Sequence, residues 1–301
     1  HHPHRPHENP QPTASPTTRS MDTILNDAIT IACYIGLSLF ILLFAKILKD
    51  VTTPYQIDVE LGEHDNVALA LSFAGYMAAV VIIFTGTLLG PTVSLWQDLL
   101  TVGLYSILGV LLLNLARVFN DRVILYQFSV TKELIQDRNC GTGAVLFGSY
   151  IGSGFIIAGA VNGEGGGILS TLAFFAAGQV VFALYTWVYN RITPYCVHDE
   201  IEKDNVAAGV ALGGALVAVG IILMSASKGD FVSWSNNFGV FAIEALAAII
   251  LLPIVRLVLD KLLIAKMDLN HEIQNDRNVG AALLEATAMI AFGSLLSVLF
   301  A

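Results

Sequence analysis

The 301-residue chain is 55% hydrophobic and only 13% charged, and its formal net charge is −9. Because soluble domains carry about 25% charged residues, this composition excludes an ordinary soluble protein. The acidic balance argues against a nucleic-acid partner, since nucleic acids bind basic surfaces. The three cysteines are scattered along the chain and predict no disulfide framework.

Residues 1–20, HHPHRPHENPQPTASPTTRS, are rich in His, Pro, Ser and Thr and contain too few apolar residues to form a core. This segment is predicted to be a disordered leader or tag, with Met21 as the expected natural start. Its four histidines offer a metal-binding tract as the alternative interpretation. No cleavable signal peptide is expected before the first span.

Apolar runs long enough to cross a membrane, about 20 residues each, recur along the rest of the chain. They predict an all-α membrane protein with eight transmembrane helices, near residues 25–48, 66–89, 95–119, 141–161, 168–190, 206–226, 237–262 and 279–301. Short turns rich in glycine alternate with four longer charged links, which lie near residues 50–65, 120–139, 191–205 and 263–278.

The positive charges predict the orientation. Twelve of the fifteen Lys and Arg residues lie in the long links or beside them, and only Arg5, Arg19 and Lys228 fall on the other side. Because cytoplasmic loops are enriched in Lys and Arg, the long links are expected in the cytoplasm. With an even number of spans, both termini are then expected outside it.

The second half of the chain repeats the first. Asn66 and Asn205 are 139 residues apart, as are Asn139 and Asn278, and the tripeptide TPY at 53–55 recurs at 193–195 with an offset of 140. We predict a first four-span repeat over 21–161 and a second over 162–301. Each repeat holds two related helical hairpins, and an axis along the membrane normal relates the repeats.

The segments DNVALALSFAGY, from Asp65, and DNVAAGVALGGALVAVGIIL, from Asp204, carry a family resemblance. They resemble the domain-of-unknown-function 350 family of multi-pass proteins from bacterial inner membranes, over about residues 25–301 as two tandem copies. The resemblance implies the bacterial inner (plasma) membrane and the tandem architecture, and it implies no reaction. Single-copy members would imply that two copies can assemble.

An acidic–Asn motif precedes each second helix of a hairpin. Asn is expected to cap the helix, since its side chain accepts bonds from the free N–H groups of the first turn; a ligand-binding role is the alternative. The charge order reverses between odd and even copies, which predicts an Arg–Asp clasp between motifs or else solvated pairs. The residues are Asp65, Asn66, Asp137, Arg138, Asn139, Asp204, Asn205, Asp276, Arg277 and Asn278.

Small residues recur at four-residue spacing in the second helices of the hairpins, at Gly148 and Gly152 and at Gly209 and Gly213. Such spacing favours close packing of membrane helices. A narrow pathway lined by small residues is the alternative interpretation.

Two acids, Glu244 and Glu285, lie inside predicted spans, where charge is expensive and suggests function. A protonated acid bonded to a neighbouring helix is the alternative. Together with Glu63 and Glu202, acids of the links that would concentrate cations, they form the predicted ion pathway. The 139-residue equivalents of Glu244 and Glu285 in the first repeat are Tyr105 and Leu146, so these two intramembrane acids belong to one half of the chain.

No nucleophile, phosphate-loop or zinc motif appears in the sequence, so no catalytic residue, metal or cofactor is predicted. We expect a non-enzymatic membrane protein that passes or senses a small cation as a channel, transporter or sensor. The alternative is a membrane scaffold or stress-response protein whose links dock a cytosolic partner. The expected partners are the lipid bilayer, a second copy of the chain, or that cytosolic protein.

Overall fold

The computed structural model describes residues 21–90, 92–163, 165–263 and 268–300. The leader predicted at 1–20 lies outside these residues. The eight predicted spans are confirmed within the described residues, as long apolar helices. They are α1 (Met21–Thr52), α3 (Val67–Leu88), α4 (Leu95–Phe119), α6 (Cys140–Ala160), α7 (Gly167–Ile192), α9 (Val206–Ser227), α10 (Trp234–Val258) and α12 (Val279–Phe300).

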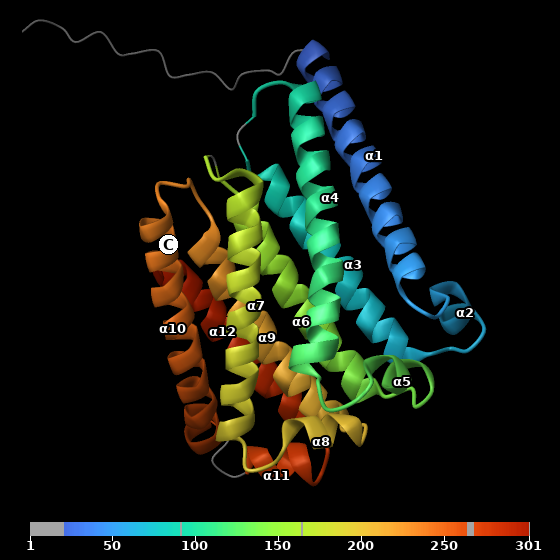
Figure 1. Cartoon of the computed structure of the whole chain (residues 1–301), viewed down its shortest axis with the longest axis vertical. Helices are drawn as coiled ribbons and strands as arrows, with labels where there is room; N and C mark the ends of the chain where they lie inside the picture. The colour runs from blue at the N-terminus through green and yellow to red at the C-terminus, as the bar shows by residue number, and fades with distance from the viewer. Residues whose placement is uncertain (1–20, 91, 164, 264–267, 301) are drawn as a thin grey trace, which may run out of the picture.

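The helices form two layers. The shorter helices pack side by side in the order α3, α6, α9, α12, and the longer helices α1, α4, α7 and α10 lie against this row. Figure 1 shows α4 and α7 in front of the row, with α1 beside α4. Each longer helix after α1 contacts the short helix of its own hairpin and that of the preceding hairpin, as α7 contacts α9 and α6. Hairpins are therefore joined through both layers.

Each charged link contains a short helix that the sequence analysis did not predict. These are α2 (Ile57–Gly62), α5 (Val130–Ile135), α8 (Val197–Glu202) and α11 (Leu269–Gln274). Figure 1 places all four links at the same end of the bundle, whereas α1 begins, and α12 ends, nearer the opposite end. This arrangement agrees with an even number of spans.

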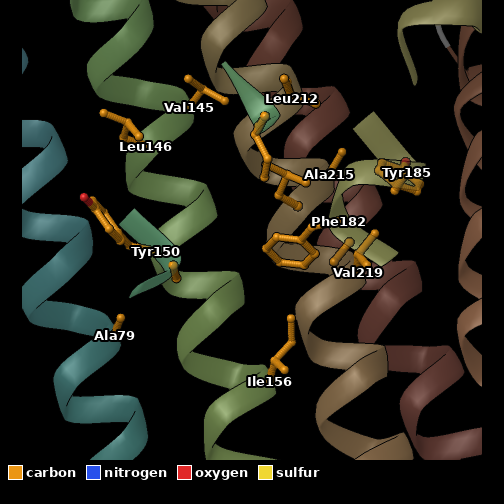
Figure 2. Close-up of a cluster of buried hydrophobic side chains, with 14 of the residues drawn as sticks. Ala79, Val145, Leu146, Tyr150, Ile156, Phe182, Tyr185, Leu212, Ala215 and Val219 are labelled. Carbon is orange, nitrogen blue, oxygen red and sulfur yellow. The ribbon is translucent and has the colours of Figure 1, made fainter. Parts of the chain in front are cut away.

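The row is held by contact between helix backbones. A methyl group added at Gly148 would collide with the backbone of Gly213, and one added at Gly220 would collide with that of Gly152. Glycine therefore permits the close approach of α6 and α9, which confirms the packing interpretation of the small-residue spacing. Figure 2 shows Leu212 and Ala215 close to Phe182 in the apolar core beside this contact.

The ends of α4 and α10 share a second feature absent from the prediction. Each continues as one π-helical turn, η1 (Asn120–Ile124) and η2 (Leu259–Leu263). Such turns are uncommon and occur frequently at functional sites. Because the two turns begin 139 residues apart, they are equivalent parts of the two repeats.

Candidate functional site

The four acidic–Asn motifs share one backbone geometry. The residue before each Asn has a positive φ between 48° and 58°, at Asp65, Arg138, Asp204 and Arg277. This left-handed turn joins the link helix to the next span. The Asn side-chain oxygen then accepts a hydrogen bond from the N–H three residues on, in all four copies. The predicted helix caps are confirmed.

The amide nitrogen of each Asn makes bonds that capping does not explain. It donates to a Glu of its own link helix, at 3.0 Å from Asn66 to Glu60 and at 2.8 Å from Asn139 to Glu133. Both acids lie outside the spans. The Asn66 bond lowers the pKa of Glu60, whereas burial raises the pKa of Glu133. The bond from Asn139 also acts to lower the pKa of Glu133, but burial outweighs it there.

The same amide nitrogen also reaches the next hairpin. At each of three successive junctions it donates to a backbone carbonyl of the following link helix. The bonds run from Asn66 to Leu134 on α5 at 2.9 Å, from Asn139 to Ile201 on α8 at 2.7 Å, and from Asn205 to Ile273 on α11 at 2.8 Å. These three Asn side chains are buried. Asn278, in the last motif, is only partly buried, and within the described residues its amide nitrogen donates to Glu272 alone.

The predicted Arg–Asp clasp does not form. Among the described residues no ion pair joins Arg138 or Arg277 to Asp65 or Asp204. The acids have other partners nearby. Asp137 pairs with Lys132, Asp276 contacts His271 at 3.4 Å, and Asp204 accepts from the backbone N–H of Gly141 at 3.0 Å. At Asp204 a backbone N–H therefore takes the place of the expected arginine.

The bond to Asp204 accounts for the reversal of charge order at the central junction. The odd motif supplies an acid that meets the positive N-terminal end of the neighbouring even helix, α6. At the junctions from odd to even hairpins the corresponding residue is Arg138 or Arg277. At this junction Asp204 therefore meets the first turn of α6, which belongs to the preceding hairpin.

Glu285 lies in a buried network between α7, α10 and α12. Its Oε1 accepts hydrogen bonds from Arg256 at 2.8 Å and from the Tyr189 hydroxyl at 2.6 Å. Arg256 also donates to the side chain of Asn270, on link helix α11, at 2.9 Å. Glu285 and Arg256 are both fully buried, and Oε2 of Glu285 has no hydrogen-bond partner. The network connects the membrane interior to a link.

The first repeat carries a different buried cation. Lys49 on α1 is fully buried between the rings of Tyr76 and Tyr150, at 4.4 and 4.6 Å from their centroids. It donates to the Tyr150 hydroxyl at 3.2 Å. No ion pair joins Lys49 to an acid in the described part of the chain. Aromatic faces stabilise the ammonium group here. The sequence analysis counted Lys49 only among the charges beside the links.

Where the two repeats meet, polar side chains line one side of α6. Ser149 donates to Asn120 at 2.7 Å, and Gln179 donates to Ser153 at 3.3 Å. All four side chains are buried, yet the Asn120 amide nitrogen and the Gln179 amide oxygen lack partners. Buried polar atoms are rarely left unsatisfied. In the sequence, Ser149 and Ser153 lie beside Gly148 and Gly152, and Gln179 is a polar residue inside a predicted span.

The other three residues of the predicted ion pathway do not belong to the network around Glu285. Glu244 is buried within α10, and its Oε2 has no hydrogen-bond partner. Glu63 and Glu202 are exposed at the link end. The structure therefore brings only Glu285, of the four predicted acids, into contact with other charged groups. Among the described residues no cluster of three His, Cys, Asp or Glu side chains could hold a metal ion.

Two cavities open on the surface of the bundle. One, of about 850 Å³, opens at the end with the short turns and is lined by residues that include Gln97, Asp98 and Thr101. The other, of about 420 Å³, is a mostly apolar groove on α12, where Glu285, Thr287 and Ala291 contribute to the lining. The groove lies at the outer end of the helix row, since α12 is its last member.

Eight apolar helices, four linked hairpins and an internal duplication define a multi-pass α-helical membrane protein. The family model described as Domain of Unknown Function (DUF350) matches residues 23–161 and 165–300, and the chain belongs to this family. The tandem copies expected from the sequence are thereby confirmed.

One relative supports the membrane assignment. The chain is 26% identical, over 262 residues, to a UPF0719 transmembrane protein from Aquifex aeolicus (strain VF5), and the alignment covers 85% of this chain and 94% of that protein. No solved structure matches the chain.

Proposed function

We propose that the protein passes or senses a small cation, most simply a proton, and that Glu285 is its working group. The proposed function is non-enzymatic. The observation that carries it is the buried contact of Glu285 with Arg256 and Tyr189. Ionisable groups inside a membrane are costly and usually serve a function. In this site the free Oε2 of Glu285 leaves one position open to a proton or a cation.

The network offers a way to transmit a change. Protonation of Glu285 would remove the negative charge beside Arg256. An unpaired buried charge costs several kcal/mol, about 3–5 when one partner of a pair is removed, so Arg256 would be driven to rearrange. Because Arg256 also holds Asn270 of α11, the rearrangement would reach the link end.

The link end supplies the second element of the proposal. Glu63 and Glu202 are exposed there, and a cluster of acids raises the local concentration of cations. The bias of Lys and Arg toward the same links supports a cytoplasmic location for them, in a bacterial inner membrane with both termini outside.

Reconstituted protein provides the test. Liposomes containing the protein should show a cation flux that falls in Glu285→Gln, because the amide keeps the shape but cannot ionise. Glu244→Gln is the matched control, since Glu244 is another buried intramembrane acid outside the network, and its flux should be unchanged.

Sensing is read in the same liposomes. A cysteine introduced at the exposed link residue Asn275 should change its labelling rate with pH, and Glu285→Gln should abolish this change. If flux equals that of empty vesicles for protons, sodium, potassium and polyamines, and labelling is independent of pH, the proposal is wrong.

Docking of a cytosolic protein is the second candidate. The backbone contact of Gly148 with Gly213 favours it, since the tight packing of α6 and α9 suits a rigid support better than a wide pore. The exposed charged residues of the links would then form the docking face. This candidate is favoured if the protein shows neither a cation flux nor a pH-dependent labelling rate.

A further inference from the structure

We propose that copies of this chain assemble head to tail in the membrane. In this assembly α12 and the fourth motif of one copy contact α1, α3 and the first motif of the next. The inference rests on the repeated junctions within the chain and is independent of cation transport.

The central junction, from the second hairpin to the third, is the template. It consists of the Asn139 bond to the Ile201 carbonyl, the Gly141 bond to Asp204, and the contact of α6 with α9. A junction from the fourth hairpin to the first hairpin of another copy would repeat this even-to-odd order.

Each polar group of the template has a counterpart at the ends of the chain. The duplication offset relates Asn139 to Asn278 and Gly141 to Gly280, on the α12 side. On the other side it relates Asp204 to Asp65, and the offset of 140 seen earlier in the link, at TPY, relates Ile201 to Leu61. In the next copy Leu61 and Asp65 would supply the carbonyl and the carboxylate that Asn278 and Gly280 lack here.

The small residues of the central junction are buried, whereas most of their equivalents on α12 and α3 are exposed. Gly141, Gly148 and Gly152 are buried on α6, and the glycines opposite them on α9 are buried as well. Their equivalents at the row ends are open: Gly280, Thr287 and Ala291 on α12 and Ala74 and Val81 on α3 are exposed, and Ala70 is partly exposed. Two matching faces of the same junction are therefore uncovered, one at each end.

The groove on α12 fits the same assignment. At the central junction Phe182 of α7 is fully buried and lies against Gly152. The equivalent of Gly152 is Ala291, which lines the groove of about 420 Å³. With the offset of 140 that relates the two TPY segments, the equivalent of Phe182 is Leu42 of α1, a helix whose most apolar stretch has only 11% of its residues buried. In the assembly α1 of the next copy fills this groove.

The end junction is not identical to its template. Thr287, Ala291 and Ala74 replace Gly148, Gly152 and Gly213, so α12 and the neighbouring α3 pack at a wider separation than α6 and α9. Small residues remain at the contact, as membrane helix interfaces favour. The contact uses different faces of the two copies, so it produces a ring if the rotation closes and a row if it does not.

Cysteine cross-linking tests the proposal in native membranes, in full-length chains whose Cys33, Cys140 and Cys196 are replaced by Ser. The variant with Thr287→Cys and Ala74→Cys, treated with an oxidant or a short bismaleimide, should give a ladder of cross-linked dimers, trimers and larger oligomers. Each single variant should give none, and two co-expressed single variants should give a dimer only.

Two further variants separate assembly from chance collision. Ala291→Trp should abolish the ladder because it blocks the interface. Leu104→Trp is the control. Leu104 is exposed on α4, a helix outside the proposed interface, so this variant should leave the ladder intact. The proposal is overturned if the double variant gives no cross-linked product, if single variants form homodimers, or if Ala291→Trp leaves the ladder unchanged.

Discussion

At the scale of single residues, the motif asparagines do two jobs with two ends of one side chain. The oxygen caps a helix, and the nitrogen binds both a glutamate and the next hairpin. The sequence predicted the first role, because Asn before an apolar helix is a local signal. It did not predict the second, because the carbonyl of Ile201 is 62 residues from Asn139 and is brought there by tertiary packing.

The glutamates bound by these asparagines predict an opposite response to pH. The lowered pKa of Glu60 means that its ionised form stabilises the fold above the ordinary value near 4.5, and this contribution is lost as the pH falls through the lowered value. The raised pKa of Glu133 means that the fold is stabilised at low pH, and this contribution is lost as the pH rises from about 4.5 through the raised value.

Glu60→Gln should therefore lower the free energy of unfolding of the protein in detergent at pH 7, by about 1.5 kcal/mol, since hydrogen bonds to charged groups contribute about 1.5–3 kcal/mol. Glu133→Gln should leave stability at pH 7 unchanged or raise it, and should remove part of the loss between pH 4.5 and 7. Melting curves across pH 4 to 8 are the measurement. An equal destabilisation of both variants at pH 7 would contradict the assigned pKa directions.

At the scale of helices, periodicity and apolar length were sufficient for the spans and insufficient for the links. The six-residue helices, such as α8, are too short and too charged to give a recognisable pattern in sequence. Charges near span ends were also misjudged. Lys49 and Arg256 were interpreted as link charges, yet both side chains are fully buried. Each donates a hydrogen bond to a residue on another helix, Lys49 to Tyr150 and Arg256 to Glu285.

The contact between α6 and α9 gives a prediction for elements. Gly148→Ala should destabilise the bundle by at least about 1 kcal/mol, since the added methyl must displace the backbone of α9 and overpacked cores typically lose 1–3 kcal/mol. Gly36→Ala is the control: nothing lies within 4 Å of its added methyl, and alanine favours a helix over glycine. Unfolding in mixed detergent measures both. Equal stability of the two variants would argue against backbone contact as the packing device.

At the scale of the whole molecule, the duplication could be predicted from the sequence because the same residue offset recurs between the two halves of the chain. The membrane side of each end was inferred from charge alone. In intact cells, with the three native cysteines replaced, Gln136→Cys should be shielded from an impermeant thiol reagent, and Thr92→Cys should be labelled. Both positions are exposed in the fold, so burial does not complicate the reading. Labelling at Gln136 with shielding at Thr92 would invert the orientation.

The central structural claim is that asparagine amides join the four hairpins into one row. Asn139→Asp and Asn278→Asp compare a joined motif with an end motif in monomeric, detergent-solubilised protein. Aspartate caps helices as well as asparagine does, and each Asn donates to a glutamate at 2.8 Å. The variants therefore differ in the bond from Asn139 to the next hairpin and in the deeper burial of residue 139.

The free energy of unfolding of these two variants is the most direct measurement. We predict that Asn139→Asp loses about 1–3 kcal/mol more than Asn278→Asp, because a buried carbonyl of α8 is left without its donor. An equal loss in the two variants would contradict the account, since the motifs would then act as helix caps alone.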